Sequence, residues 1–253
     1  MRIFASSDLH TDFAENWRLV RELSTQAFLD DTLIVAGDIA DDLGVIEGTL
    51  KMLSARFKHV CYLPGNHELW VRDAAYDSVE KFRQVLGLCL RLNVHTQPVL
   101  VNDCWIVPLF SWYDADSAMA AVADYAELEG WADFYFCKWP QSIDLPVADF
   151  FLRMNEPHLK SYDRPVITFS HFVPRGDLLP APDNLRFKAL SKVASCDRLE
   201  EQLRRVGAVA HLFGHSHIAC DRVIDNVRYV QNPLRYPRER RTPGFPLKLI
   251  RHT

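Results

Sequence analysis

The stretch RIFASSDLH, residues 2–10, joins a short apolar run to an Asp-x-His pair, and similar combinations recur along the chain. Residues 2–6 have the apolar and aromatic character of a buried strand. Further runs of this kind predict buried strands at 32–36, 60–63, 105–110, 165–169, 210–213, 222–230 and 247–250. Helical periodicity lies between several of them, at 16–29, 45–57, 76–92 and 197–206. This alternation predicts a layered α/β fold in which two sheets can pack together.

The segment from Trp112 to Arg164 departs from this alternation. It is rich in aromatic residues around an alanine-rich, helix-like piece, and these aromatics are Trp112, Tyr113, Trp131, Phe134, Tyr135, Phe136 and Trp139. We expect residues 1–253 to form one domain that carries 112–164 as an insertion or cap. We also expect the aromatic rings to pack as a small satellite cluster, in preference to stacking on a substrate.

The composition is that of an ordinary globular chain. With 253 residues, 48% hydrophobic and 25% charged, the chain is long enough for one well-cored domain. A formal net charge of −4 gives no general attraction to nucleic acid or to an anionic membrane. Affinity for a phosphate group must therefore be built locally.

The cysteines and the N-terminus both favour the cytoplasm. Six cysteines lie apart without any CxxC pair, which predicts free thiols in a reducing compartment. The N-terminal apolar run is too short for a signal peptide or a membrane anchor, and no later segment is long enough to span a bilayer. We therefore expect a cytoplasmic protein with no membrane partner.

Polar motifs follow five of the predicted strands. They are Asp8-Leu9-His10, Gly37-Asp38, Gly65-Asn66-His67-Glu68, Ser170-His171 and Gly214-His215-Ser216-His217. Loops at the carboxyl ends of strands converge in α/β sheets, so residues far apart in sequence can meet there. In an extended chain, side chains two residues apart share a face, so Asp8 and His10 are expected to point into one site. The same spacing pairs His215 with His217.

The chemistry of these residues predicts a metal site. The candidate ligands are two carboxylates, one amide and four imidazoles, namely Asp8, Asp38, Asn66, His10, His171, His215 and His217. Because the set has no thiolate, it favours Mn, Fe, Zn or Co over a structural cysteine site, and manganese is preferred. Seven ligands suit two ions that share a carboxylate, about 3.5–4 Å apart. Such a pair activates water and neutralises phosphoryl charge, so hydrolysis of a phosphate ester is the predicted reaction.

The ordered set of motifs resembles the signature of the calcineurin-like metallophosphoesterases, from the first strand to residue 217. The resemblance implies a four-layer α/β-β/α sandwich with two packed mixed sheets and a dinuclear centre at the strand ends. It implies two ligand sets, which are Asp8, His10 and His217 for one metal and Asn66, His171 and His215 for the other. Asp38 would bridge the two metals.

The same resemblance implies that His67 points away from the metals and assists the leaving group as a catalytic residue. Glu68 and Asp41 would support the ligands without binding metal. After Asp38 the chain reads Ile-Ala-Asp-Asp, without the Asp-Arg of protein phosphatases. This departure argues against a Ser/Thr protein phosphatase, and the pattern is more similar to small prokaryotic phosphodiesterases and phosphomonoesterases.

Arg72 and Arg175 follow metal-binding motifs and are candidates for contact with a small phosphate-ester or nucleotide-derived substrate. Arg175 is preferred, although an ion pair is an equally good interpretation of this residue. The basic run Arg235 to Arg241 could bind nucleic acid, but flanking prolines favour a solvated loop. Three functions stay open: a phosphodiesterase, which is preferred, a phosphomonoesterase, and a non-catalytic protein-binding scaffold. The complete set of ligands argues against the scaffold.

Overall fold

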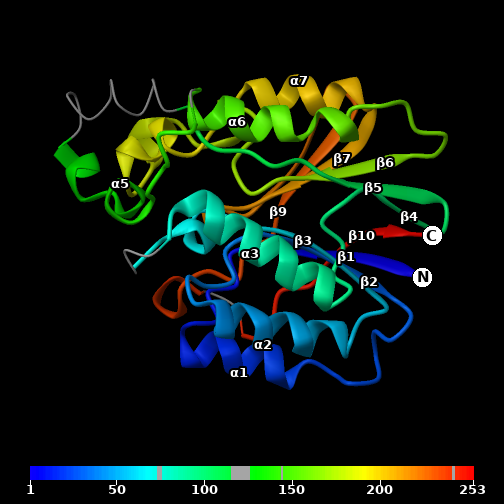
Figure 1. Ribbon diagram of the computed structural model, residues 1–253. Coiled ribbons are helices and arrows are strands. Elements are labelled where there is room, and N and C mark those ends of the chain that lie inside the picture. Colours follow the sequence, from blue (N-terminus) through cyan, green and yellow to red (C-terminus); the bar gives the residue numbers. More distant parts are fainter. Residues whose placement is uncertain (73–75, 115–125, 144, 241–242) are drawn as a thin grey trace.

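Two mixed β-sheets form the centre of the molecule in this computed structural model, which describes residues 1–72, 76–114, 126–143, 145–240 and 243–253 (Figure 1). The first sheet has the order β10-β1-β2-β3. Its strands are β1 (Arg2–Ser6), β2 (Thr32–Ala36), β3 (His59–Leu63) and β10 (Lys248–His252). The strands β1, β2 and β3 run parallel, whereas β10 pairs antiparallel with β1. The carboxyl ends of three strands therefore meet at one edge.

The second sheet has the order β4-β5-β6-β7-β9-β8. Its strands are β4 (Val99–Val101), β5 (Cys104–Pro108), β6 (Val166–Phe169), β7 (Ala208–Phe213), β8 (Cys220–Ile224) and β9 (Val227–Gln231). The four central strands are parallel, and the edge strands β4 and β8 are antiparallel to their neighbours. Polar motifs follow β6 and β7 of this sheet.

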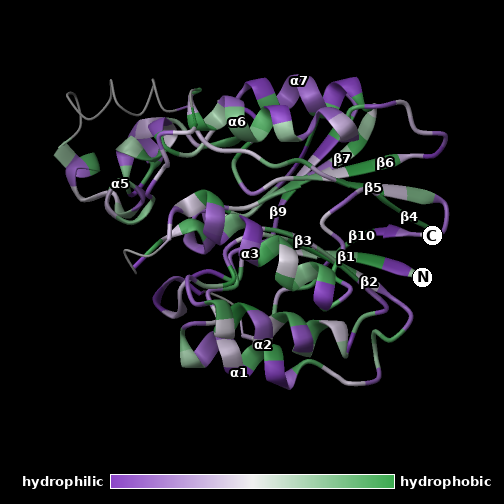
Figure 2. Ribbon diagram, viewed as in Figure 1, coloured by the Kyte–Doolittle hydropathy of each residue, from purple (hydrophilic) through white to green (hydrophobic). Residues whose placement is uncertain are grey.

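Helices cover the outer face of each sheet and leave the two inner faces in contact (Figure 1). The helices α1 (Ala14–Glu22), α2 (Leu43–Ser54) and α3 (Ser78–Arg91) lie on the first sheet, and α6 (Val147–Met154) and α7 (Arg198–Arg205) lie on the second. Successive side chains of β1 point to opposite faces of the sheet. Ile3 packs in the core between the sheets, and Phe4 packs in the core under α1 and α2. Hydrophobic residues mark the strands, while polar residues mark the exposed surfaces of the helices (Figure 2). The predicted four-layer α/β sandwich is confirmed.

The segment 112–164 contributes to the main core. It contains the short helix α5 (Ala132–Phe136) and α6, whereas its alanine-rich piece falls at 115–125, outside the described residues. Trp112 and Tyr113 are buried in the cluster between the two sheets. The expectation of a satellite cluster is therefore wrong for these rings, because they continue the central core. Trp131 is half-buried and stacks on Phe187 at a ring distance of 5.6 Å.

Several predicted element boundaries differ from the structure. The run 222–230 is a hairpin of β8 and β9 around Asp225 and Asn226, whose φ angles of 47° and 65° are those of a tight type I′ turn. The first helix ends at Glu22, because the Ser24 hydroxyl accepts backbone hydrogen bonds and forms a local turn. The short edge strand β4 was not predicted. Among the described helices, none has the length and apolar character needed to span a membrane.

Candidate metal centre

The five polar motifs meet at the carboxyl ends of β1, β2, β3, β6 and β7. Carboxylate and imidazole groups gather there into two sets that could each hold a metal ion, with ligand atoms within 4.8 Å of one another. One set is Asp8, His10, Asp38 and His217, and the other is Asp38, His171 and His215. Asp38 belongs to both sets, so the two positions adjoin across its carboxylate.

The predicted pairs converge for a different reason from the one the sequence suggested. Asp8 and His10 lie beyond the end of β1 and have φ angles of 52° and 43°, so their backbone is left-handed rather than extended. His215 and His217, beyond β7, have φ angles of 70° and 56°. The predicted alternation of side chains along an extended strand is therefore wrong for these pairs, because left-handed turns aim the side chains into the site.

The first set is almost closed to solvent. Asp8 and His10 are completely buried, and only His217 is partly exposed. The Nε2 atoms of His10 and His217 lie 2.9 Å apart, and Asp8 Oδ1 is 3.7 Å from His217 Nε2. His217 directs its Nδ1 to Glu239 at 2.7 Å, which leaves the Nε2 lone pair free to face the other ligands.

The second set includes the Asn66 side chain. Asn66 Oδ1 lies 3.0 Å from both His171 Nε2 and His215 Nδ1. The other ring nitrogens of these histidines lie 2.9 Å from backbone carbonyl oxygens, of Ala36 for His171 and of Val193 for His215. In the neutral tautomer that donates its one N–H to the carbonyl, each histidine directs a lone pair at Asn66.

This arrangement fits a cation. An amide oxygen and two ring lone pairs are all acceptors, and acceptors that converge at 3.0 Å need a positive charge between them. The pKa of His171 reflects the same need for positive charge, because a protonated His171 supplies it through an Nε2–H that donates to Asn66 Oδ1. Burial alone would lower the pKa of His171, yet the Asp38 carboxylate raises it to about 9. Burial would raise the pKa of Asp38, but the positive charge of His171 holds it well below its ordinary value.

His67 lies beside both sets. Its Nε2 is 3.9 Å from Asp38 Oδ2 and 3.2 Å from the Tyr236 hydroxyl. Its ring packs on Trp70 at a centroid distance of 3.7 Å. Burial lowers the pKa of His67 to about 4, so the ring is neutral at pH 7. A neutral imidazole at this position can donate a hydrogen bond to a leaving-group oxygen.

Glu68 holds the loops that carry the ligands. Its buried carboxylate accepts hydrogen bonds from the backbone N–H groups of Gly65, Asp38 and Ile39. Burial and the charge of Asp38 raise the pKa of Glu68 to about 7. Gly65 is required here, because a Cβ would lie 2.2 Å from Asp38 Oδ1. Glu68 therefore supports the site through the backbone.

Asp133, from the segment 112–164, orients the amide ligand and was not identified from the sequence. Its buried Oδ1 accepts hydrogen bonds from Asn66 Nδ2 at 2.8 Å and from Trp70 Nε1 at 2.6 Å, and Oδ2 accepts one from Trp131 Nε1 at 2.9 Å. Because Asp133 is an acceptor only, it fixes the Asn66 amide with its oxygen towards the histidines. A lone acidic residue among tryptophans was the only sequence signal for this role.

The two candidate arginines lie in different places. Arg72 pairs with Asp41 at 2.5 Å and lines a cavity that His67 also lines. Arg175 pairs with Asp177 at 2.7 Å and with Glu200 at 3.4 Å. Among the described residues that line the cavities at the metal centre, Arg175 is absent.

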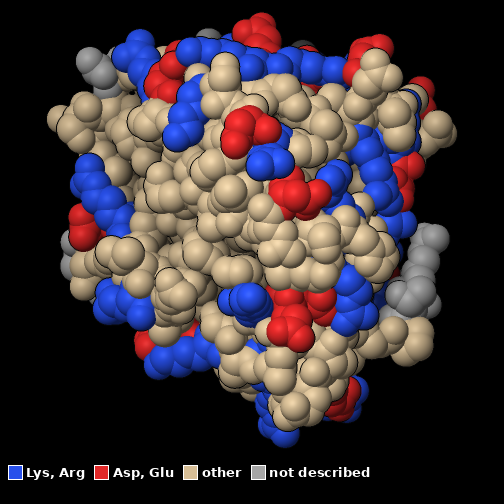
Figure 3. Space-filling view, turned by 90° about the vertical axis from the view of Figure 1, so that its right-hand side faces the viewer, with Lys and Arg blue, Asp and Glu red and all other residues tan. Residues whose placement is uncertain are grey.

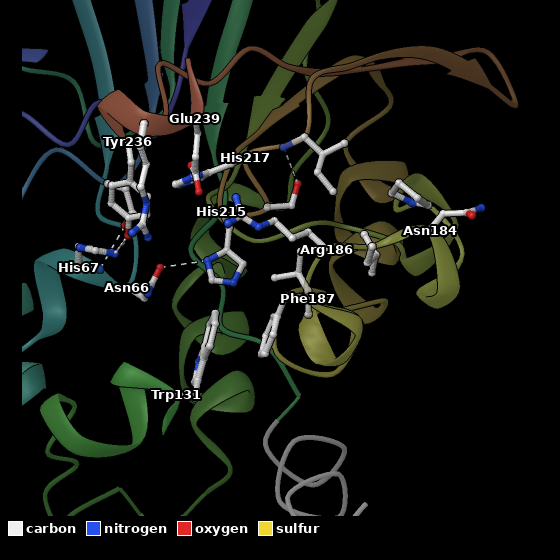
Figure 4. Close-up of a pocket in the computed structure, with 17 residues that line it drawn as sticks. Asn66, His67, Trp131, Asn184, Arg186, Phe187, His215, His217, Tyr236 and Glu239 are labelled. Atoms are coloured by element: carbon white, nitrogen blue, oxygen red, sulfur yellow. Dashed lines mark hydrogen bonds and ion pairs between the residues drawn. The ribbon is translucent and has the colours of Figure 1, made fainter. Parts of the chain in front are cut away.

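Two cavities meet at His67, Tyr236 and Arg238. The main cavity, of about 680 Å³, exposes Asn66, His215 and His217 (Figure 4). Its opposite wall is largely apolar and aromatic, formed by Trp131, Pro180, Leu185, Phe187 and Leu190. The second cavity, of about 550 Å³, is lined by Phe13, Trp70, Arg72 and the acidic residues Asp12, Glu15 and Asp41.

The fold and this site are those of a calcineurin-like phosphoesterase: the model of that family matches residues 1–219, and the chain belongs to the family. It is therefore an enzyme that hydrolyses phosphoric esters with the help of metal ions. The chain is 30% identical over 267 residues to the [acyl-carrier-protein] phosphodiesterase PptH of Mycobacterium tuberculosis, covering 95% of this chain and 80% of that protein.

Solved structures share the fold of this chain. The crystal structure of phosphopantetheinyl hydrolase (PptH) from Mycobacterium tuberculosis matches with a TM-score of 0.78 and 26% identity, over 98% of this chain and 95% of that one. A further solved structure, at 14% identity and a TM-score of 0.51 over 92% of this chain and 90% of its own, shares the fold alone.

Proposed function

We propose that this chain is a phosphodiesterase with two divalent ions. Asp8, His10 and His217 would hold one ion, Asn66, His171 and His215 the other, and Asp38 both. The shared position of Asp38 and the convergent acceptors around Asn66 support this division. Oxygen and imidazole donors without thiolate favour manganese, with iron, zinc and cobalt as alternatives.

Each part of the site has a distinct task. When bound, divalent ions supply Lewis acidity, which acidifies water and neutralises negative charge on the phosphoryl group. Asp38 supplies the negative charge between the two positions, and Glu68 and Asp133 keep the ligands in place. His67 donates a hydrogen bond from Nε2 to the leaving-group oxygen, which takes the place of its contact with the Tyr236 hydroxyl.

The meeting of two cavities at His67 is the observation that favours a diester. A phosphodiester has two arms, and each cavity can receive one of them, whereas a monoester needs only one. The main cavity suits a long, largely apolar arm, because Trp131, Leu185, Phe187 and Leu190 offer it apolar surface beside the charged Arg186 and Arg238.

The relatives suggest which diester this is. By their names, they act on acyl carrier protein and on a phosphopantetheinyl group. We therefore propose as substrate the phosphodiester that joins a phosphopantetheine arm to a carrier protein, with the arm in the main cavity. A nucleotide-derived diester is the second candidate, because the stacked rings of Trp131 and Phe187 line the main cavity and offer an aromatic surface to a base.

We also propose that the protein is cytoplasmic and forms a single domain. All six cysteines are free thiols, which supports the cytoplasm as a reducing compartment. We retain residues 1–253 as a single domain with 112–164 as an insertion, since α6 and Trp112 pack against the same core as the strands.

The test compares three substrates with the manganese-loaded protein. Intact mass spectrometry follows release of the arm from holo acyl carrier protein, and absorbance follows bis-p-nitrophenyl phosphate and p-nitrophenyl phosphate. We expect the two diesters to be hydrolysed in preference to the monoester. Faster turnover of the monoester by orders of magnitude would exclude a diesterase.

Two variants test the assignment of the residues. Asp38→Asn should abolish most turnover and weaken metal binding, because it removes the carboxylate common to both positions. His67→Ala should lower kcat by about 10²–10⁴-fold while metal content stays near that of the unmodified protein. Elemental analysis measures the metal, and an equal loss of metal in both variants would refute the role given to His67.

A further inference from the structure

Four arginines line a third cavity that adjoins the metal centre. Arg186 comes from the loop before Phe187, and Arg235, Arg238 and Arg240 come from the basic run after β9, of which Arg241 lies outside the described residues. The cavity has a volume of about 620 Å³ and includes His217 on its wall. We call these four arginines and the space between them the arginine groove.

The guanidinium groups of the groove form no close ion pair in the described parts of the chain, although the charge of Arg238 acts on Glu239 at longer range. Other arginines form close ion pairs, such as Arg228 with Asp221 at 2.8 Å and Arg251 with Asp103 at 3.1 Å. In the groove, the buried Nε atoms of Arg235 and Arg240 have no hydrogen-bond acceptor among the described residues. Arg251 also has a buried Nε that meets no acceptor in the part of the chain that the structure describes, although it pairs with Asp103. What distinguishes the groove is therefore that four guanidinium groups gather in one cavity without a close ion pair to any described residue.

The local charge is strongly positive. Glu239 is the acidic residue among those that line the groove, and its carboxylate is engaged by His217 at 2.7 Å. Four arginines against one carboxylate leave three positive charges, in a chain whose formal net charge is −4. The opposite end of the molecule, which carries the termini, shows Lys and Arg interspersed with Asp and Glu (Figure 3). The groove is therefore a local feature and does not follow from the overall charge.

The position of the groove connects it with the reaction. Arg238 lines all three cavities, and Arg186 lines both the groove and the main cavity. Both side chains are exposed, and they lie on two separate segments of the chain. Four guanidinium groups on two segments offer more hydrogen-bond donors than one phosphate group can accept, and they suit several carboxylates on a larger ligand.

We propose that the arginine groove docks an acidic surface of the protein that carries the phosphodiester, and thereby directs the ester bond towards the metal centre. This inference rests on the proposed function, because it assumes that one arm of the diester is a protein. The carboxylates of the partner would pair with the exposed guanidinium groups of Arg186 and Arg238.

Binding and turnover are measured separately. The binding probe is a bacterial acyl carrier protein with acidic residues around its modified serine, in the form that lacks the phosphopantetheine arm. The double variant Arg186→Glu and Arg238→Glu should weaken binding by about tenfold or more and reduce its salt dependence. The matched control is Arg153→Glu on α6, an exposed arginine that lines none of the three cavities.

Turnover then separates docking from catalysis. In the double variant, kcat/KM for the holo carrier protein should fall far more than kcat/KM for bis-p-nitrophenyl phosphate. Equal losses on both substrates would overturn the proposal, because the arginines would then act on the reacting phosphate. It would also be overturned if Arg153→Glu weakened binding as much, or if a single-stranded oligonucleotide bound the unmodified protein more tightly than the carrier protein.

The two proposals fail in different ways. If the unmodified protein hydrolyses small diesters and leaves the holo carrier protein intact, the proposed substrate is wrong. If the carrier protein without its arm binds the unmodified protein and the double variant equally, or binds neither, the docking role is wrong.

Discussion

Substitution of Asp133 by Asn tests how the segment 112–164 supports the metal centre. The carboxylate of Asp133 accepts hydrogen bonds from Asn66, Trp70 and Trp131, and it is buried. Asparagine has one acceptor oxygen, so its amide group must face at least one of these donors. In the best orientation, Asn66 and Trp70 keep their acceptor and the indole N–H of Trp131 loses it.

The expected effect has two parts. A buried donor without an acceptor costs about 1–3 kcal/mol of folding stability. The neutral amide oxygen is also a weaker acceptor than the carboxylate, so the hydrogen bond that orients Asn66 weakens, and an outer hydrogen bond of this kind contributes about 10- to 100-fold, or about 1.4–2.8 kcal/mol, to metal binding. Because Asp133 contacts Asn66 and none of Asp8, His10 or His217, only one of the two binding events should weaken.

Titration calorimetry with Mn²⁺ measures both events directly, and elemental analysis gives the metal content after dialysis. The matched control is Trp131→Phe, which removes the same indole hydrogen bond and leaves the contact between Asp133 and Asn66 intact. This control should keep both ions. Two unchanged binding events in the Asp133→Asn protein would show that the orientation of Asn66 does not depend on Asp133.

Three further predictions concern stability. Glu68→Gln leaves at least the backbone N–H of Ile39 without an acceptor, so the free energy of unfolding in urea should fall by about 1–3 kcal/mol, and an unchanged midpoint would contradict this role. The hydrogen bonds from Arg2 outweigh burial and hold the pKa of Asp31 below its ordinary value. This pair therefore stabilises the protein above about pH 4 and loses its effect as the pH falls, so the Tm deficit of Asp31→Asn should be present at pH 7 and shrink towards pH 3. Removal of metal with a chelator should lower the Tm and Mn²⁺ should restore it, whereas identical Tm values would argue against a bound ion.

The layered fold could be predicted because strand and helix signals alternate clearly in the sequence. Residues 2–6 and 32–36 are short buried strands in the structure, as their apolar character indicated. The convergence of Asp8, Asp38 and His171 was predictable too, because parallel strands end at the same edge of a sheet. Each strand and each polar motif can be recognised from a few neighbouring residues, which is why these features could be predicted.

The remaining features depend on contacts between distant segments. Glu239 orients His217 from 22 residues away, and Asp133 orients Asn66 from 67 residues away. Neither acid belongs to a motif, so nothing close to it in sequence indicates its partner. The role of Trp112 in the central core is of the same kind, since it depends on the packing of the segment 112–164 between the two sheets.

The left-handed backbone at the metal centre has a consequence for anyone who transfers this site to another protein. Asp8, His10, Asp38, His215 and His217 all have positive φ angles, a conformation that costs a residue other than glycine roughly 1–3 kcal/mol. Copying the side chains onto regular strand ends would reproduce the chemistry of the ligands but not their directions. A successful graft would have to include the loops themselves and a scaffold stable enough to hold them before any ion arrives.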